Sequence, residues 1–277
     1  HNEPRCRWCP AAALLTMKLT ARQTLVHLYH SWRNRLGLPV DYADFEFDRA
    51  KAALDWQNIP AQRIRSVAAL LDTDEAEVSG YVAEAEQIEA PGSRYSGPER
   101  FEGVGSPMGR TDRITLYALV RASKPAVAVE TGTAAGASSL YILRAFEANE
   151  RGFLHSIDAA KTRTNIGSLV PPDLRQRAKF HVGDSLDVLK QKLSDIGPID
   201  LFLHDSRHHY AHMMAEFNWA LRHAGPQCVL ASHDVLLTNA WAHFLRKGKI
   251  SQSDVVKNLG FCLLNKRSIY RGHAFRG

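Results

Sequence analysis

The stretch Glu130–Ser139, ETGTAAGASS, follows directly on the apolar run AVAV at 126–129. A glycine-bearing turn after a strand usually approaches a nucleotide-like ligand, because glycine lets the backbone come close without an intervening side chain. The stretch is not a GxGxxG dinucleotide fingerprint, since Glu130 and Ala135 occupy the first and third glycine positions. No Gly-Lys-Ser/Thr follows, so it is not a P-loop either. The pattern ExGxxxG, with glycines at 132 and 136, therefore predicts a ligand-binding turn of another kind.

Around this turn, short apolar runs alternate with helical patterns, which is typical of parallel βα units in an α/β fold. The last part of the chain holds two apolar runs around 265–267, which we interpret as a hairpin that completes a Rossmann-like sheet of seven strands. The five parallel strands are expected at 126–130, 153–158, 178–183, 199–204 and 228–233, and the helices at 137–149, 162–168, 185–194, 208–223 and 238–247.

The N-terminal part of the chain shows helical patterns at 20–36, 48–57, 61–72 and 74–88, and no strand candidate before residue 100. We therefore expect a helical cap over 17–100 and a catalytic domain over 101–277, which begins with a helix at 111–122. The stretch 90–109 is rich in Gly, Pro and Ser and reads as a linker or loop. Residues 1–16 precede Met17 without a pattern and are expected to be a tail or an artificial extension.

Composition restricts the class of protein. At 277 residues and 45% hydrophobic content the chain can form one large α/β domain with an appendage. No run approaches the roughly 20 apolar residues that cross a bilayer, and the core at 11–15 is too short for a secretory signal, so we expect a cytoplasmic protein without membrane contact. The net charge of +6 comes from scattered Lys and Arg and does not identify a partner.

Cysteine usage predicts neither a metal centre nor a disulfide framework. Cys6 and Cys9 form a CxxC motif, but a zinc site would need two further ligands nearby. Cys228 and Cys262 stand singly in apolar runs, so we expect both to be buried as small hydrophobic residues.

Over roughly residues 100–277, the sequence resembles the class I S-adenosylmethionine (SAM)-dependent methyltransferases, and their first motif corresponds to the stretch that begins at Glu130. The resemblance implies the seven-stranded sheet of that family. The resemblance implies that Asp158, ending HSID, binds the ribose hydroxyls and that Asp184, in HVGDS, lies beside the adenine amino group. Backbone N–H groups near Ala137 and Ser138 suit the methionine carboxylate. An aspartate that ends a strand is also a common helix cap. The prediction therefore rests on Glu130, Asp158 and Asp184 taken together in this order, and not on any one of them. The cofactor-binding residues that we expect are Glu130, Gly132, Thr133, Gly136, Ser138, Asp158, Asp184, Ser185 and Asp205.

Two segments at the predicted fourth and fifth strand ends are rich in histidine and aspartate: LFLHDSRHHYAHM (201–213) and VLASHDV (229–235). They are similar to a branch of small-molecule O-methyltransferases, including antibiotic and sugar methyltransferases, that holds a divalent cation, usually magnesium. The resemblance implies the metal ligands Asp205, His233 and Asp234. His233 departs from the acid of that branch, and a histidine suits Mn²⁺, Fe²⁺ or Zn²⁺ better than Mg²⁺.

Three interpretations of this cluster stay open. Asp205 and Asp234 hold a cation, with His233 or His209 completing the set; or a neutral histidine, His208 or His209, acts as general base beside Asp205; or Asp205 merely caps the helix that begins near His208. The catalytic candidates are Asp205, His208, His209 and His233. We expect His204 and His212 to be structural, because strand alternation turns His204 away from its neighbour Asp205.

The acceptor is expected to contact the cap and the 94–113 loop. Candidate contacts are Tyr95, Phe101, Met108, Arg110, Arg113 and Trp241, although a solvated surface explains either arginine and core packing explains Trp241 equally well.

These observations favour a SAM-dependent O-methyltransferase acting on a hydroxyl of a small molecule such as a natural-product intermediate, with Mg²⁺ or Mn²⁺ as an open question. A nucleic-acid methyltransferase is the alternative, disfavoured because no Asn-Pro-Pro-Tyr type motif or aromatic ladder is present. A metal-dependent oxygenase on the same fold and a non-catalytic scaffold are further alternatives. An apolar helix face in the cap leaves a homo-oligomer open.

Overall fold

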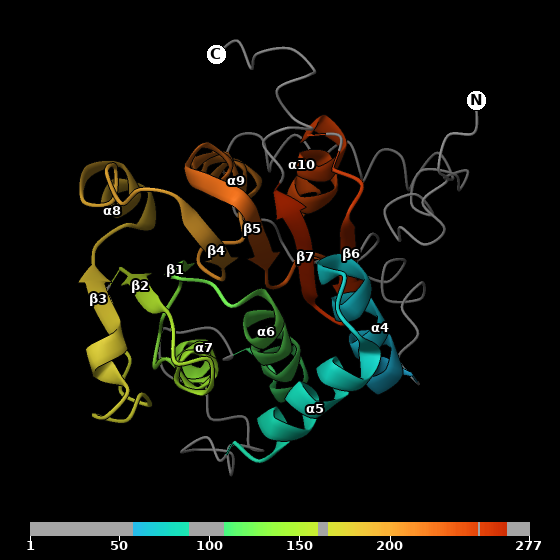
Figure 1. Ribbon diagram of the computed structural model, residues 1–277. Helices are drawn as coiled ribbons and strands as arrows, with labels where there is room; N and C mark the ends of the chain where they lie inside the picture. The colour runs from blue at the N-terminus through green and yellow to red at the C-terminus, as the bar shows by residue number, and fades with distance from the viewer. Residues whose placement is uncertain (1–57, 89–107, 160–165, 249, 265–277) are drawn as a thin grey trace.

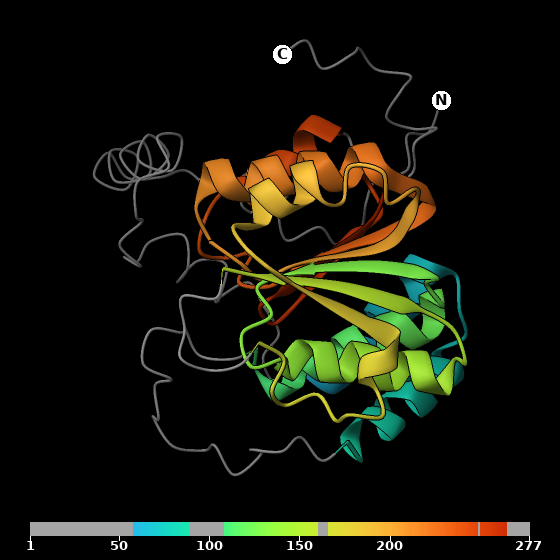
Figure 2. The same cartoon turned by 90° about the vertical axis from the view of Figure 1, so that its left-hand side faces the viewer.

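The computed structural model describes residues 58–88, 108–159, 166–248 and 250–264, and within them seven strands form one sheet between two helical layers (Figures 1 and 2). The strand order is β3-β2-β1-β4-β5-β7-β6. Strands β1 to β5 run parallel, whereas β7 is antiparallel to β5 and to β6. The predicted α/β fold with a seven-stranded sheet is confirmed.

The five parallel strands lie where the apolar runs predicted them, within a few residues. Their bounds are β1 Val127–Thr131, β2 Phe153–Asp158, β3 Ala178–Val182, β4 Ile199–His204 and β5 Ala224–Ser232. The register pairs Thr131 with both Ile157 and His204, and His204 with Ser232. The carboxyl ends of β2, β1, β4 and β5 therefore meet at one edge of the sheet, which brings the segments after them together.

Each face of the sheet has its own hydrophobic core. The lower layer in Figure 1 consists of α4 (Ile59–Leu71), α5 (Glu75–Glu86), α6 (Arg110–Ser123) and α7 (Ala137–Ala148). The upper layer consists of α8 (Ser185–Gln191), α9 (Tyr210–His223) and α10 (Ala240–Gly248). Successive side chains of a strand point to opposite faces of the sheet. Ala128 therefore packs in the lower core and its neighbour Val129 in the upper one.

Two helices of the predicted cap, α4 and α5, share the lower core with α6 and α7. Helix α4 is also tied to the last strands, because the Ser66 hydroxyl donates to the Asp254 carboxylate at 2.7 Å and the Gln62 amide donates to the Val255 carbonyl at 3.1 Å. The helices expected at 20–36 and 48–57 lie outside the described residues, as do 1–16 with their CxxC motif. The boundary drawn at residue 100 stays a prediction.

The predicted position of the closing hairpin is wrong. Its strands are β6 (Ser253–Val256) and β7 (Leu259–Leu264), and its turn is formed by Lys257 and Asn258 rather than by 265–267. The apolar run GFCLL is thus the second strand of the hairpin, buried between β5 and β6. Lys257 adopts a left-handed φ of 56°, which permits the tight turn. The apolar run expected after 267 lies outside the described residues.

The segment before β3 also differs from the prediction of a helix at 162–168. Residues 166–169 form turns, 160–165 lie outside the described part, and a short 3₁₀ helix at Arg175–Arg177 leads into β3. The physical reason is that this segment bonds to the ligand-binding turn instead of to itself. The N–H groups of Gly167 and Leu169 donate to the carbonyls of Ala134 and Ala135 at 3.0 and 2.8 Å.

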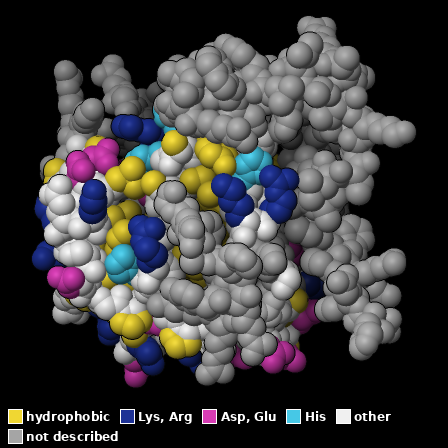
Figure 3. Space-filling model, turned by 90° about the horizontal axis from the view of Figure 1, so that it is seen from above, with side chains coloured by type: hydrophobic (Ala, Val, Ile, Leu, Met, Phe, Trp, Pro, Cys, Tyr) yellow, Lys and Arg dark blue, Asp and Glu magenta, His cyan; other side chains and the backbone are white. Residues whose placement is uncertain are grey.

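Each helix of the upper layer ends with basic residues. Helices α8, α9 and α10 carry basic residues in their last turns, where cations interact favourably with the helix dipole. Seen from above, this face shows Lys and Arg side chains and histidines among hydrophobic ones (Figure 3).

Two further expectations concern burial. Cys228 and Cys262 are buried in the upper core, as predicted, and burial raises the pKa of the Cys262 thiol. None of the helices in the described ranges has the length and apolar character required to cross a membrane.

Candidate active site

The turn after β1 needs both of its glycines. Gly132 and Gly136 each have a φ of +90°, a conformation that other residues rarely adopt. A Cβ atom on Gly132 would lie 2.0 Å from the backbone oxygen of Asp205, and one on Gly136 would lie 2.9 Å from Cα of Gly167. The glycines thus let the turn pack directly against the segment after β4 and the segment before β3.

Glu130 fixes the turn after β1 through hydrogen bonds of its side chain. Its buried carboxylate accepts hydrogen bonds from Ser138 at 2.5 Å, from Ser156 at 2.6 Å and from Ser139. Thr133 and Ser156 are joined through their hydroxyls at 2.5 Å. Burial raises the pKa of Glu130, and the three hydroxyl donors oppose that shift. Glu130, Thr133 and Ser138 therefore form the framework that fixes the turn, with α7 beginning directly after Gly136.

The acids after β2 and β3 lie on either side of this framework. The Asp158 carboxylate is half-buried and accepts the N–H of Ala134 at 2.7 Å, so it holds the turn itself. Asp184 caps α8 by accepting the N–H of Leu186 at 3.0 Å. The capping role considered in the sequence is thus real for Asp184. A carboxylate has two oxygens, and a cap occupies one of them.

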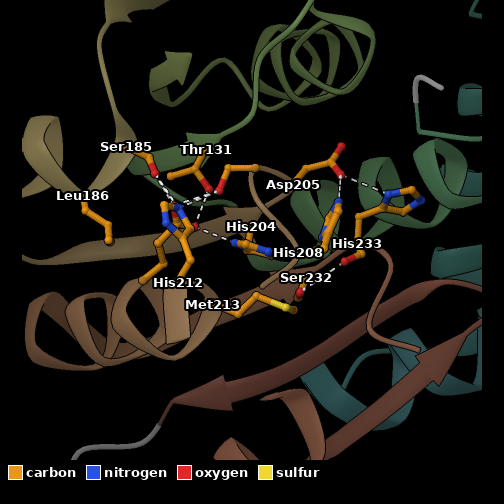
Figure 4. Close-up of polar contacts among 12 residues, drawn as sticks. Thr131, Ser185, Leu186, His204, Asp205, His208, His212, Met213, Ser232 and His233 are labelled. Atoms are coloured by element: carbon orange, nitrogen blue, oxygen red, sulfur yellow. Dashed lines mark hydrogen bonds and ion pairs between the residues drawn. The ribbon is translucent and has the colours of Figure 1, made fainter. Parts of the chain in front are cut away.

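A second group of polar side chains gathers at the ends of β4 and β5 (Figure 4). His208 and His233 both point toward Asp205. Nδ1 of His233 lies 3.0 Å from Oδ1 of Asp205, and its Nε2 lies 3.5 Å from Oδ2 of Asp112. Nε2 of His208 lies 3.8 Å from Asp205 and 3.7 Å from Asp234. We call Asp112, Asp205, His208, His233 and Asp234 the carboxylate–histidine cluster.

The two histidines of the cluster differ in protonation. Burial lowers the pKa of His233, but Asp112, Asp205 and Asp234 outweigh burial and raise it to about 10. Burial, together with the neighbouring His204 and His233, lowers the pKa of His208 to about 3. The cluster therefore holds one imidazolium and one neutral imidazole near pH 7, and such separated pKa values are how sites distinguish an acid from a base.

The predicted metal ligands Asp205, His233 and Asp234 do lie together, but not as a cation site. A histidine binds a metal through the lone pair of a neutral ring nitrogen. Both ring nitrogens of His233 face carboxylates, Nδ1 toward Asp205 and Nε2 toward Asp112. Across the ranges that the structure describes, no three His, Cys, Asp or Glu side chains are arranged to hold a metal ion. These residues, as arranged, do not fit a divalent cation.

Asp112 was not predicted as a site residue from the sequence. It lies in the first turn of α6, is fully buried, and is approached by Lys257 Nζ at 3.9 Å and by the N–H of Asn258 at 3.4 Å. The hairpin turn thus contributes to the site. A signal was available, because Asp112 stands three and four residues before buried Thr115 and Leu116, on the buried face of the helix.

Glu216 was also missed. This fully buried carboxylate on α9 accepts hydrogen bonds from five side chains: Thr131 at 2.7 Å, His204 at 2.5 Å, Ser206 and His212 at 2.9 Å each, and Ser185. Burial by itself raises its pKa, yet His204 and His212 outweigh burial and hold the pKa well below its usual range. His204 and His212 therefore point away from Asp205, in the structural role expected of them.

The predicted acceptor contacts fall into two groups. Met108 is buried, Arg110 donates to the backbone oxygen of Glu86 at 2.6 Å, and the Arg113 guanidinium lies over the Tyr141 ring at 5.1 Å. Trp241 packs in the upper core, so core packing explains it. Tyr95 and Phe101 lie outside the described residues. His209 is the N-cap residue of α9, although its side chain does not form the capping bond.

Comparison with known proteins finds a family match for the part of the chain that contains most of the site residues. Residues 129–235 match the model of a family described as a methyltransferase domain. No curated protein matches the chain. The matched range includes the turn after β1, both histidine-rich strand ends and Glu216.

Solved structures share a distant likeness with the chain. The O-methyltransferase TomG from Streptomyces achromogenes, involved in tomaymycin synthesis and in complex with SAM, is 18% identical, with a TM-score of 0.47 over 67% of this chain and 89% of that one. An O-methyltransferase from Bacillus cereus in complex with S-adenosylhomocysteine (SAH) is 19% identical, with a TM-score of 0.43 over 72% and 94%. A methyltransferase from Geobacter sulfurreducens is 20% identical, with a TM-score of 0.46 over 68% and 89%.

At these identities and TM-scores the solved structures are too distant to assign a cofactor, a metal or an acceptor to this chain. The family match covers the residues that form the ligand-binding turn and most of the cluster beside it. The match to a methyltransferase-domain family therefore extends over residues 129–235 of the chain.

Proposed function

We propose that this protein is a SAM-dependent O-methyltransferase that methylates a hydroxyl of a small molecule, such as a natural-product intermediate. One observation carries the proposal. The turn after β1 and the carboxylate–histidine cluster both lie at the carboxyl edge of the sheet, where open α/β sheets bind ligands. A cytoplasmic location and a role in natural-product biosynthesis belong to the same proposal.

The cofactor would lie across the strand ends. In this arrangement the first N–H groups of α7 face the methionine carboxylate, because a helix N-terminus favours an anion. Asp158, after β2, would accept hydrogen bonds from the ribose, and Asp184, after β3, would lie beside the adenine. The methyl group would then point toward the ends of β4 and β5, where Asp205 and His233 lie.

The chemistry required there is simple. The acceptor oxygen attacks the methyl carbon in line with the C–S bond, which breaks as the sulfonium becomes a thioether, and the hydroxyl proton passes to a base. We propose His208 as this base, since it lies beside Asp205 and Asp234 and its buried Nδ1 has no hydrogen-bond partner among the described residues. Asp205 and Asp234, both within 3.8 Å of Nε2, would stabilise the imidazolium that forms.

His233 serves a different purpose in this proposal. With its nitrogens directed at Asp205 and Asp112, it carries its own proton and holds Asp205 in place. It therefore supplies a fixed positive charge between the carboxylates. This is the metal-free interpretation among the three that the sequence left open.

Titration calorimetry with SAH tests the function directly. We expect binding with a Kd in roughly the micromolar range, unchanged after chelation and after addition of Mg²⁺ or Mn²⁺. The variant Asp158→Asn serves as the control, and it should bind less tightly. Absence of binding under every condition would refute the methyltransferase proposal. Binding that requires added cation would refute the metal-free route alone.

A further inference from the structure

The two oxygens of the Glu216 carboxylate have different partners. Oε2 accepts from Thr131, at the end of β1, and from His204, at the end of β4. Oε1 accepts from Ser185, from Ser206 and from His212. One oxygen thus joins two neighbouring strand ends, while the other joins the segments that follow β3 and β4.

The partners of Oε1 lie next to the two proposed ends of the cofactor pocket. Ser185 directly follows Asp184, which we place at the adenine end, and Ser206 directly follows Asp205, which we place at the methyl end. Figure 4 shows Thr131, Ser185, His204 and His212 directed toward one common point, with Asp205 and His233 to one side. A single carboxylate oxygen therefore connects the two ends.

Burial makes this connection rigid. Glu216 has no solvent exposure, so water cannot replace a donor that its carboxylate loses, and each lost bond costs more than an ordinary surface hydrogen bond. His204 and His212, both buried, contact its two oxygens, His204 at Oε2 and His212 at Oε1. The loops that carry Asp184 and Asp205 are consequently held to one fixed core group instead of moving independently.

We infer that Glu216 is a positioning residue that sets the separation between the adenine end and the methyl end of the cofactor pocket. The inference rests on the proposed function. It predicts that Glu216 matters for a ligand that spans both ends and little for a ligand that occupies one end, because preorganisation favours simultaneous engagement of two subsites.

The variant Glu216→Gln tests the inference with two ligands, SAH and adenosine. An amide keeps the shape of the side chain but replaces one acceptor oxygen with a donor group, so one of the two sets of bonds must break. We expect the Kd for SAH to rise about tenfold or more, and the Kd for adenosine to change by less than about threefold. The measured quantity is the ratio of the two Kd values in titration calorimetry.

A second variant keeps the test decisive if Glu216→Gln does not fold. Ser206→Ala removes the bond between Oε1 and the segment after β4, together with a longer contact of 3.3 Å between Ser206 and His212, and leaves the Glu216 carboxylate in place. Ser206 is only half-buried, so the fold should persist. We expect the same selective weakening for SAH, smaller in size, with adenosine binding unchanged.

Asp254→Asn is the matched control. Asp254 is another largely buried carboxylate that accepts a serine hydroxyl, from Ser66, but it links α4 to β6 away from the strand ends. Its loss should lower stability and leave the ratio of the two Kd values unchanged. This control separates a specific effect on the pocket from general destabilisation.

The outcomes are distinguishable. If wild-type protein binds SAH, and folded Glu216→Gln or Ser206→Ala binds SAH as tightly, the inference is wrong and the proposed function stands. An equal weakening for SAH and adenosine, or the same change in Asp254→Asn, also overturns the inference. If the wild type itself does not bind SAH, the proposed function has failed.

Discussion

Gly132 shows how closely the backbone segments approach one another at the site. The space that a methyl group would need is filled by the carbonyl of Asp205, which is itself fixed because the N–H of Asp205 donates to the Thr131 carbonyl at 2.8 Å. Neither segment can give way without breaking the bonds between β1 and β4. The glycine is thus required by two features at once, its positive φ and the absence of a side chain.

Gly132→Ala should therefore be costly. We expect the free energy of unfolding to fall by about 2 kcal/mol or more, as strained backbone and steric overlap combine, and SAH binding to be lost. Gly80→Ala is the control, because Gly80 lies exposed in α5 with no atom within 4 Å of the added Cβ. It should stabilise the protein by about 0.5–1 kcal/mol. Urea denaturation of both variants measures this, and equal effects would contradict the steric explanation.

Single residues also show the limit of sequence reasoning. The acids after the parallel strands could be predicted because strands and helices alternate, and strand ends meet at one edge. Asp112 and Glu216 could not be found that way, since both lie inside helices. Glu216 stands on the apolar face of α9 with Met213, Phe217 and Ala220, at helical spacing. A charged residue on a buried face signals a polar network, but only the fold reveals its partners.

At the scale of elements, α8 combines a structural and a proposed functional role in one residue. Its N-cap Asp184 accepts the N–H of Leu186, and the helix has only seven residues. A short helix depends strongly on its cap, because few internal hydrogen bonds support it. The position of α8 in turn fixes Ser185, whose hydroxyl reaches Glu216.

Two substitutions separate these roles of Asp184. Asp184→Ala should lower the free energy of unfolding by about 1 kcal/mol and weaken SAH binding. Asp184→Asn should keep the stability, since asparagine caps equally well, and still weaken SAH binding. Thermal unfolding and calorimetry measure both. Normal SAH binding by Asp184→Asn would show that Asp184 is a cap only.

The elements that sequence reasoning misplaced have a common cause. The segment before β3 has its N–H groups satisfied by the turn after β1, a partner that is distant in sequence and leaves no local pattern. The hairpin turn at Lys257 and Asn258 is short, and the sequence predicts the apolar run GFCLL as the first strand of the hairpin although it is the second, paired with β5 on its other side. In both cases contacts between distant segments decided the structure.

At the scale of the whole molecule, stability should depend on pH through His233. Its pKa in the folded protein is about 10, above the ordinary value of 6.5, because the carboxylates around it outweigh burial. A raised pKa contributes stability that is fully present below the unfolded value. That contribution is lost as the pH rises from about 6.5 through 10.

The comparison of wild type with His233→Gln measures this contribution. The difference in free energy of unfolding between the two should be large at pH 6 and should shrink steadily toward pH 10, because other groups that titrate there affect both proteins alike. Urea denaturation at several pH values provides the data, and an NMR titration of the imidazole checks the pKa directly. A difference that stays constant with pH would show that His233 is not the titrating group.

The contacts of Asp112 have a consequence for divergence among related sequences. His233 and Lys257 approach this one buried carboxylate from different parts of the chain, so the charges at the three positions depend on one another. A substitution at one of them leaves an uncompensated charge at another. Across relatives, we expect positions 112, 233 and 257 to covary, with a neutral residue at 112 accompanied by loss of positive charge at 233 or 257. Amino-acid substitutions at the hairpin turn would then be restricted by a helix that begins almost 150 residues earlier.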